Sequence, residues 1–230
     1  MTEPQQPDAR PDGITIQVIH DGPYKVFGAT TGRIVEIATD AGGDSRDYTT
    51  LETFTLRDGS ELCRCGHSQT KPLCDNSHEK AGVDVRETAQ HRQYRDDAEV
   101  NKGPEVTMFD KDLLCAHARF CDAGLGAWDE VSMSGEEHRA EAARIVRHCP
   151  GGRLTLIDNA TGADLDGVEE QRIEVIEDPA IGAAGPIMLR GGVTVIAADG
   201  RAYEVRNRQA LCRCGKSENK PFCDGSHDPR

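Results

Sequence analysis

The sequence predicts an α+β fold made of several small units, and three observations lead to that prediction. Only 37% of the 230 residues are hydrophobic and 4% are aromatic, which would supply a single large core poorly. Short segments with alternating apolar and polar residues recur along the chain, as in half-buried strands. Nine cysteines fall into three groups of three, which divides the chain into three parts. At about 150 residues per domain, the length alone allows one or two ordinary domains.

The alternating segments give the expected strands, which occupy residues 14–19, 33–37, 53–56, 106–109 and 154–157. Near the C-terminus, residues 193–197 and 202–205 flank Asp199-Gly200, a strong hairpin signal.

One longer helix is expected in the middle of the chain. The sequence from Ser134 to Glu137 has the form of a capping box, and it predicts a helix running to about His148. Ala140, Ala143 and Val146 would share one face of that helix. With the two neighbouring strands, this segment predicts a compact β-α-α-β unit, whose core would include Phe120 and Trp128.

Charge and motif content exclude several classes of function. The formal net charge of −13 argues against a nucleic-acid-binding surface and favours a basic partner. No apolar run is long enough for a membrane span, and residues 1–12 lack the features of a secretory signal, so we expect a cytoplasmic protein. In a reducing compartment, clustered cysteines more often bind metal or do redox chemistry than form disulfides. No catalytic triad, phosphate loop, dinucleotide fingerprint or spaced carboxylate pair occurs, so we expect no substrate chemistry of the chain's own.

An internal repeat contains six of the nine cysteines. The first copy, from Cys63 to His78, reads CRCGHSQTKPLCDNSH, and the second, from Cys212 to His227, reads CRCGKSENKPFCDGSH. Both have the spacing C-x-C-x8-C-x3-H. Upstream, residues 16–21 resemble residues 173–178, and Gly-Pro follows in both copies. The first copy is longer by an insertion expected within residues 38–51. Asp75 and Asp224 are expected to cap a short helix after the third cysteine of each copy.

Three cysteines and one histidine can hold either zinc or an iron–sulfur cluster. Zinc sites usually space their first pair as C-x2-4-C, so that two sulfurs span one edge of a tetrahedron. The tighter C-x-C suits a [2Fe-2S] cluster, in which one iron would take Cys63 and Cys65 and the other would take Cys74 and His78. Thiolate and imidazole serve both metals, so the residues alone leave both sites open between zinc and iron–sulfur.

Both copies resemble the CDGSH iron–sulfur family, also called mitoNEET-like, whose signature includes Lys-Pro-x-Cys-Asp-Gly-Ser-His. The second copy matches it throughout, and the first has Asn76 in place of Gly, the next best residue at a positive φ. The resemblance implies a [2Fe-2S] cluster at each site, under a small β-rich cap. The implied ligands are Cys63, Cys65, Cys74 and His78 in the first copy, and Cys212, Cys214, Cys223 and His227 in the second. Family members with one motif form dimers, so the two units are expected to pair within one monomer with pseudo-twofold symmetry.

The central cysteines follow a different pattern. Cys115 and Cys121 have the spacing C-x5-C, and Cys149 is followed by Pro. Bacterial ferredoxins use C-x2-C-x2-C with a remote Cys-Pro, whereas the middle position here is Ala118. The segment resembles divergent single-cluster ferredoxins, which implies a third cluster, 3Fe-4S or 4Fe-4S, on these three cysteines. His117 is a candidate fourth ligand, and three ordinary buried cysteines are the alternative.

These observations divide the chain into three domains and two linkers. They are a first CDGSH-type domain at 13–80, a charged linker at 81–104, a ferredoxin-like domain at 105–158, a linker at 159–172 and a second CDGSH-type domain at 173–230. The sequence thus predicts a multi-cluster iron–sulfur protein that transfers single electrons to a partner with a basic patch. The alternatives are delivery of clusters to apo-proteins or iron storage, and a zinc-bound interaction module.

Overall fold

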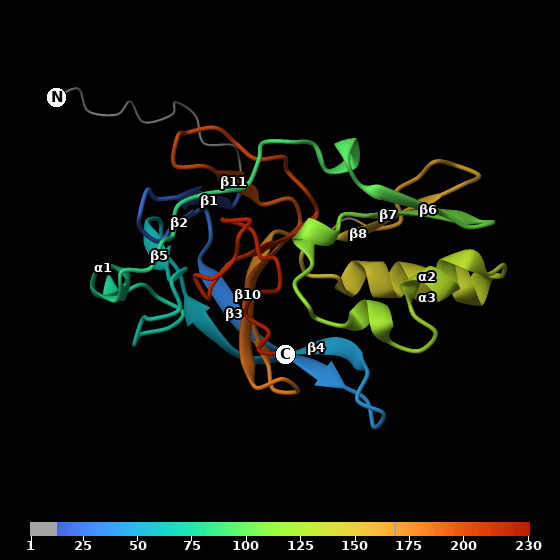
Figure 1. Cartoon of the computed structure of the whole chain (residues 1–230), viewed down its shortest axis with the longest axis horizontal. Coiled ribbons are helices and arrows are strands. Elements are labelled where there is room, and N and C mark those ends of the chain that lie inside the picture. The colour runs from blue at the N-terminus through green and yellow to red at the C-terminus, as the bar shows by residue number, and fades with distance from the viewer. Residues whose placement is uncertain (1–12, 168) are drawn as a thin grey trace.

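The computed structural model describes residues 13–167 and 169–230 and has a mixed α+β fold in which strands predominate (Figure 1). Residues 1–12, for which the sequence predicts no secretory signal, lie outside the described residues. In the described part of the chain, no helix is long and apolar enough to cross a membrane.

Two sheets form the body that holds the repeated motifs. The first has the order β11 (Thr194–Ile196), β1 (Thr15–Val18), β2 (Tyr24–Phe27) and β5 (Ser60–Leu62). The second has the order β12 (Arg208–Leu211), β10 (Ala183–Arg190), β9 (Arg172–Asp178), β3 (Thr31–Thr39) and β4 (Ser45–Thr55). Each sheet contains strands from both copies, because β1 pairs with β11 and β3 pairs with β9, both in parallel.

The two sheets correspond strand by strand. The order β11-β1-β2-β5 in the first matches β3-β9-β10-β12 in the second, and β5 and β12 each lead directly into a C-x-C. The strand without a counterpart, β4, begins inside residues 38–51, where the sequence predicts the insertion. Both copies contribute to one core, which includes the buried residues Ile16, Tyr24, Leu62, Ile173, Ile187 and Leu211.

The central segment forms a third, antiparallel sheet with two helices packed against it. Its order is β6 (Glu99–Lys102), β7 (Val106–Asp110) and β8 (Leu154–Asp158), and the helices are α2 (Ala127–Ser132) and α3 (Glu136–His148). Two 3-10 turns, η2 (Asp112–Leu114) and η3 (Phe120–Asp122), precede them. The expected β-α-α-β arrangement is present, and β6 adds a strand from within the stretch expected to be a linker, which also contains η1 (Tyr94–Asp96).

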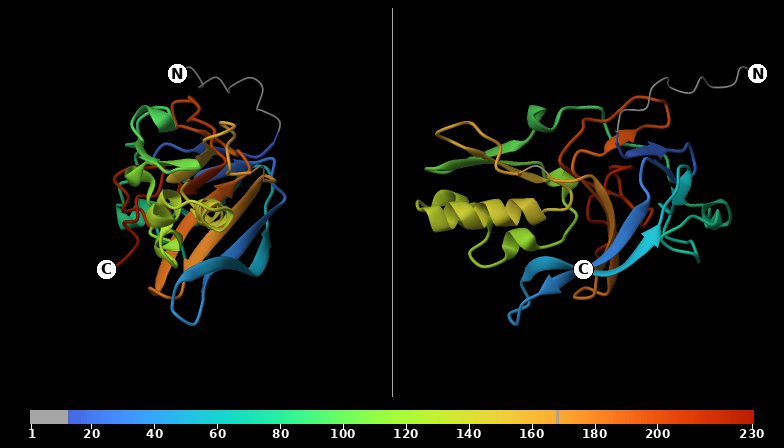
Figure 2. Two further views of the ribbon diagram at one scale, coloured as in Figure 1. Left: turned by 90° about the vertical axis from the view of Figure 1, so that its right-hand side faces the viewer. Right: turned by 180° about the vertical axis from the view of Figure 1, so that it is seen from behind.

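The two ends of the molecule carry different segments. The short helix α1 (Ser77–Ala81), which follows the first motif, lies at one end of the long axis, and α2 and α3 lie at the other (Figures 1 and 2). Strand β10 of the second copy lies between them. The second copy therefore separates the first motif from the central helices.

Three local expectations differ from the structure. Helix α3 begins after Gly135, which has φ 122° and donates its N–H to the Glu105 carboxylate, so the capping box at Ser134 does not form. On α3, Ala143 and Val146 are buried, but Ala140 is exposed. The hairpin at Asp199-Gly200 keeps its turn, but its second arm makes only one bridge, between Ile196 and Ala202.

Candidate metal centres

The ligand residues of the first motif form two close pairs. The Sγ atoms of Cys63 and Cys65 lie 3.7 Å apart, and the Sγ of Cys74 lies 3.9 Å from Nδ1 of His78. The second motif repeats this arrangement, with 3.8 Å between the Sγ atoms of Cys212 and Cys214 and 3.5 Å between Sγ of Cys223 and Nδ1 of His227.

These separations fit two irons per motif. Two donors on one tetrahedral ion, with a metal–sulfur distance of about 2.3 Å and a metal–nitrogen distance of about 2.0 Å, lie roughly 3.5–3.8 Å apart. Each pair therefore has the spacing to share one ion, and each motif offers two such pairs, as a [2Fe-2S] rhomb needs. Among residues 13–167 and 169–230, no group of three or more His, Cys, Asp or Glu side chains is placed to hold a single metal ion.

The arginine between the first two cysteines braces each loop against its own sheet. Arg64 is buried and donates from Nε to the carbonyl oxygen of Gly22 (2.5 Å) and from Nη2 to that of Ile19 (2.8 Å). In the second copy, Arg213 makes the equivalent contacts, at 2.9 Å each, to the carbonyl oxygens of Gly185 and Ile176. These residues were not among the site residues predicted from the sequence, although an arginine stands at the same place in both motifs.

The aspartate after the third cysteine ties the two arms of the loop together. Asp75 accepts a hydrogen bond from the backbone of Gln69 (2.8 Å), and Asp224 accepts one from Glu218 (2.7 Å). Hydrogen bonds from Ser77 and Gln69 hold the pKa of Asp75 at about 2. The expectation that both aspartates cap a helix is wrong. The N-cap of α1 is Asn76, and in the described residues no helix follows Asp224.

Backbone N–H groups point at the thiols of both motifs. His67 donates to Sγ of Cys65 (3.4 Å), Asn76 to Sγ of Cys74 (3.4 Å) and Lys216 to Sγ of Cys214 (3.5 Å). Such donors favour the thiolate form that binds metal.

Burial acts on the thiols in the opposite direction. It raises the pKa of Cys65, Cys74 and Cys223. A hydrogen bond from the Cys212 thiol lowers the pKa of Cys214 to about 7. Metal binding must therefore displace protons from most of these thiols, and higher pH will favour loading.

The two motifs meet at their second cysteines. Cys65 and Cys214 form an antiparallel backbone bridge, and the glycine after each has a positive φ. A Cβ on Gly66 would lie 2.9 Å from the carbonyl oxygen of Cys214, and one on Gly215 would lie 2.8 Å from that of Cys65. Glycine is therefore required in both C-x-C-G sequences, because the two chains pass too closely for a side chain.

The three central cysteines line one pocket of about 410 Å³. Cys115 follows η2, Cys121 lies in η3 and Cys149 follows the last residue of α3, and all three are half-buried. Burial raises the pKa of Cys121 and of Cys149. The structure thus brings together three thiols from separate elements, as a cluster with three protein ligands needs.

His117 lines the same pocket but also contacts the second motif. Its Nδ1 lies 3.4 Å from the carboxylate of Asp228, and a Cβ on Gly225 would lie 2.5 Å from its ring. Its role as a fourth ligand of a central cluster stays a prediction.

A buried arginine joins the third central cysteine to the second copy. Arg208 of β12 is 1% exposed and donates to the carbonyl oxygens of Cys149 (3.0 Å) and Leu154 (3.2 Å) and to the carboxylate of Asp166 (2.9 Å). Burial raises the pKa of Asp166.

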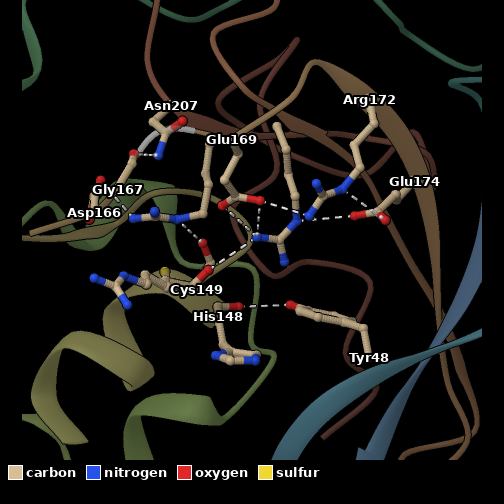
Figure 3. A network of polar contacts seen from close by, with 12 residues as sticks. Tyr48, His148, Cys149, Asp166, Gly167, Glu169, Arg172, Glu174 and Asn207 are labelled. Carbon is tan, nitrogen blue, oxygen red and sulfur yellow. Dashed lines mark hydrogen bonds and ion pairs between the residues drawn. The ribbon is translucent and has the colours of Figure 1, made fainter. Parts of the chain in front are cut away.

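Figure 3 shows the polar network around this junction. Glu169 and Glu174 lie within 3.0 Å of the buried guanidinium of Arg190, and the Tyr48 hydroxyl donates to the His148 carbonyl oxygen at 2.8 Å. The central segment is therefore joined to both copies here, to the first through Tyr48 of β4 and to the second through Arg190, which also donates to the Arg147 carbonyl oxygen at 3.2 Å.

Comparisons with known proteins agree with this organisation. The family model described as an iron-binding zinc finger of CDGSH type matches residues 21–79 and 184–228. The model described as a divergent 4Fe-4S mono-cluster matches residues 101–159, between them. The search of curated proteins gave no match, and neither did the search of solved structures. The layout expected from the sequence, two CDGSH-type regions around a divergent single-cluster region, is confirmed.

Proposed function

Two regions of the CDGSH iron-binding family and one divergent 4Fe-4S mono-cluster region make up most of this chain, and from that premise we propose a multi-cluster protein for one-electron transfer. The observation that carries the proposal is the duplicated pairing of ligands at 3.5–3.9 Å, which suits one [2Fe-2S] cluster in each motif. The pocket with three cysteines would hold a third cluster, 3Fe-4S or 4Fe-4S.

The ligand set determines the redox character of the outer sites. A bound [2Fe-2S] cluster accepts and releases one electron. The neutral imidazoles of His78 and His227, each in place of a thiolate, make these sites less negative than four-cysteine sites. We therefore expect potentials above the roughly −400 mV of plant-type ferredoxins. The N–H donors to the cysteine sulfurs shift the potential in the same direction.

We also propose that the two CDGSH units pair with pseudo-twofold symmetry inside one monomer. The sheets support this proposal, because each copy contributes strands to both of them. Strand β1 pairs with β11 in the first sheet, and β9 pairs with β3 at the equivalent position of the second. The bridge between Cys65 and Cys214 would then lie close to the pseudo-twofold axis.

The setting and partners follow from charge and cysteine chemistry. All nine cysteines are free thiols, which suits a reducing cytoplasm. The net charge of −13 favours a redox partner with a basic patch. The proposal includes no substrate chemistry at any of the three sites.

Metal analysis and electron paramagnetic resonance test this function. Anaerobically purified protein should be red-brown and carry about four labile sulfides from the outer sites, or about eight with a central 4Fe-4S cluster. Reduction with dithionite should produce signals of reduced clusters. Colourless protein with stoichiometric zinc would contradict the proposal and favour a zinc-bound interaction module.

Delivery of clusters to apo-proteins is the second candidate, and the half-buried positions of Cys74 and His78 favour it. If delivery depends on release from the histidine, the variant with His78→Cys and His227→Cys should transfer its clusters more slowly to an apo-ferredoxin. Unchanged transfer together with a lower redox potential would argue against this route and favour electron transfer.

A further inference from the structure

The two CDGSH sites have the same ligands but different surroundings. Cys74 of the first site is half-buried and Asn76 beside it is exposed. At the equivalent positions of the second site, Cys223 is 3% exposed and Gly225 is buried. The first site therefore exposes part of its third cysteine, whereas the equivalent cysteine of the second site is covered, and the histidines of both sites are half-buried.

The central segment provides the cover of the second site. The ring of His117 lies against Gly225, and Ala116 forms a buried cluster with Ala210 and Cys223. The next contact along the chain is an ion pair in which the Arg119 guanidinium donates twice to the Asp178 carboxylate at 2.7 and 2.9 Å. Asp178 is 2% exposed, so this pair is fixed inside the junction.

The cover also explains the one difference between the copies in the Cys-Asp-x-Ser-His sequence. Asn76 and Gly225 both have a positive φ, 64° and 85°, so backbone conformation alone permits Asn at either site. A Cβ at position 225 would lie 2.5–2.8 Å from three atoms of the His117 ring, so any side chain there would have to displace that ring. At position 76 the side chain is exposed and asparagine is accommodated.

We propose that the first CDGSH site exchanges with external molecules, whereas the second is an internal site that His117 and its neighbours keep closed. This inference rests on the proposed function, because it assigns different roles to the two clusters that the proposal places in the chain. A chelator or acceptor could approach the ligand pair Cys74 and His78 directly. At Cys223, which is 3% exposed, it would first have to displace the loop that carries His117.

The test follows the loss of clusters from the intact protein under an anaerobic ferrous chelator. Native mass spectrometry should show two phases of equal amplitude for the two [2Fe-2S] clusters, with the slow phase about tenfold slower. His78→Cys and His227→Cys keep a ligand in place and change the absorption spectrum of one site at a time. The first substitution should alter only the fast phase and the second only the slow phase.

Substitutions at the contact then test its cause. Gly225→Asn introduces the residue of the first copy and should accelerate the slow phase several-fold without changing the fast one. Asn76→Gly is the reciprocal substitution in the first copy and should leave the slow phase unchanged, because position 76 lies outside the contact with His117. His117→Ala should reproduce the effect of Gly225→Asn without a new side chain at position 225. The double variant with Gly225→Asn and His117→Ala should accelerate the slow phase little more than either single variant does, because both substitutions open the same contact.

Three results would overturn the inference. They are equal loss rates in the unchanged protein, equal acceleration of both phases by Gly225→Asn, and loss of the central cluster alone in His117→Ala with the slow phase unchanged. The last result would instead make His117 a ligand of the central cluster. Failure of the proposed function is distinguishable, because the purified protein would then contain no iron–sulfur cluster to follow.

Discussion

At the scale of single residues, the arginine between the first two cysteines links each loop to its sheet. Arg64 and Arg213 are buried and bind the carbonyl oxygens of equivalent residues, two contacts each. A lysine would keep the charge but could not donate in this forked geometry. The residue therefore acts on the shape of the ligand loop without contacting the metal ligands themselves.

We predict that Arg64→Lys lowers the free energy of unfolding by about 1.5–3 kcal/mol, the range for hydrogen bonds to a charged group. Anaerobic urea unfolding of cluster-loaded protein, followed by far-ultraviolet circular dichroism, measures the change. Arg57→Lys, at an exposed position of the same copy, is the control and should stay within about 0.5 kcal/mol. Equal midpoints for the two variants would show that the contacts of Arg64 add nothing to stability.

The ligand residues were accessible to sequence reasoning because their spacing is local. The C-x-C and C-x3-H spacings are those of the pairs that meet in the structure, and Asn76 has the positive φ expected of it. The close approach of another side chain to Gly225 was not accessible. It comes from His117, which lies far away in the sequence and carries no local sign of this contact.

At the scale of secondary structure, the alternating patterns identified strands but not their partners. Such patterns report which side chains are buried, and burial is the same whichever strand lies alongside. The parallel pairing of β3 with β9 joins the two copies and therefore depends on their mutual packing. The prediction of a capping box at Ser134 failed for a similar reason. The Gly135 N–H donates to the carboxylate of Glu105, which is remote in the sequence, and this contact fixes where the helix begins.

The 3-10 turn η3 shows how the central segment is attached to the second sheet. Phe120, which the sequence placed in the core of the central unit, is 2% exposed and packs with Val35, Ile37, Ile176 and Met188 of the sheet. The next residue, Cys121, lines the central pocket. The packing of this one turn therefore positions Cys121 relative to the second sheet, which contains strands from both copies.

We predict that Phe120→Ala lowers the free energy of unfolding by about 3–5 kcal/mol through the cavity that it leaves. It should also change the paramagnetic resonance signal of the central cluster while leaving the spectra of the outer clusters intact. Leu125→Ala, at a position that is 53% exposed, is the matched control and should change stability by less than about 0.5 kcal/mol. A central signal unchanged by Phe120→Ala would contradict the positioning role of this turn.

At the scale of the whole molecule, the junction between the central segment and the second copy depends on a buried ion pair. Arg208 and Asp166 are both buried, and Arg208 also holds the carbonyl oxygen of Cys149. Arg208→Met should cost about 3–5 kcal/mol, because it leaves the carboxylate buried without a partner. Adding Asp166→Leu should restore most of that stability in urea unfolding. A double variant as unstable as the single one would show that the contact with Cys149 matters more than the ion pair.

The net charge of the molecule determines how it should meet its partner. An oxidised [2Fe-2S] core carries +2, and three thiolates bring such a site to −1, so loading both outer sites makes the formal charge of −13 more negative still. Long-range attraction to a basic protein accelerates association at low salt, and salt screens it over about 10 Å at 0.1 M.

We therefore predict that the reduced protein transfers electrons to a basic c-type cytochrome at a rate that falls steeply as ionic strength rises from 10 to about 150 mM. Stopped-flow absorbance of the cytochrome measures this rate. The same cytochrome with acetylated lysines is the matched control, and its rate should be lower at low salt and nearly independent of salt. Equal rates and equal salt dependence for the two cytochromes would show that charge does not guide the encounter, and the partner would then have to be recognised by shape and apolar contact.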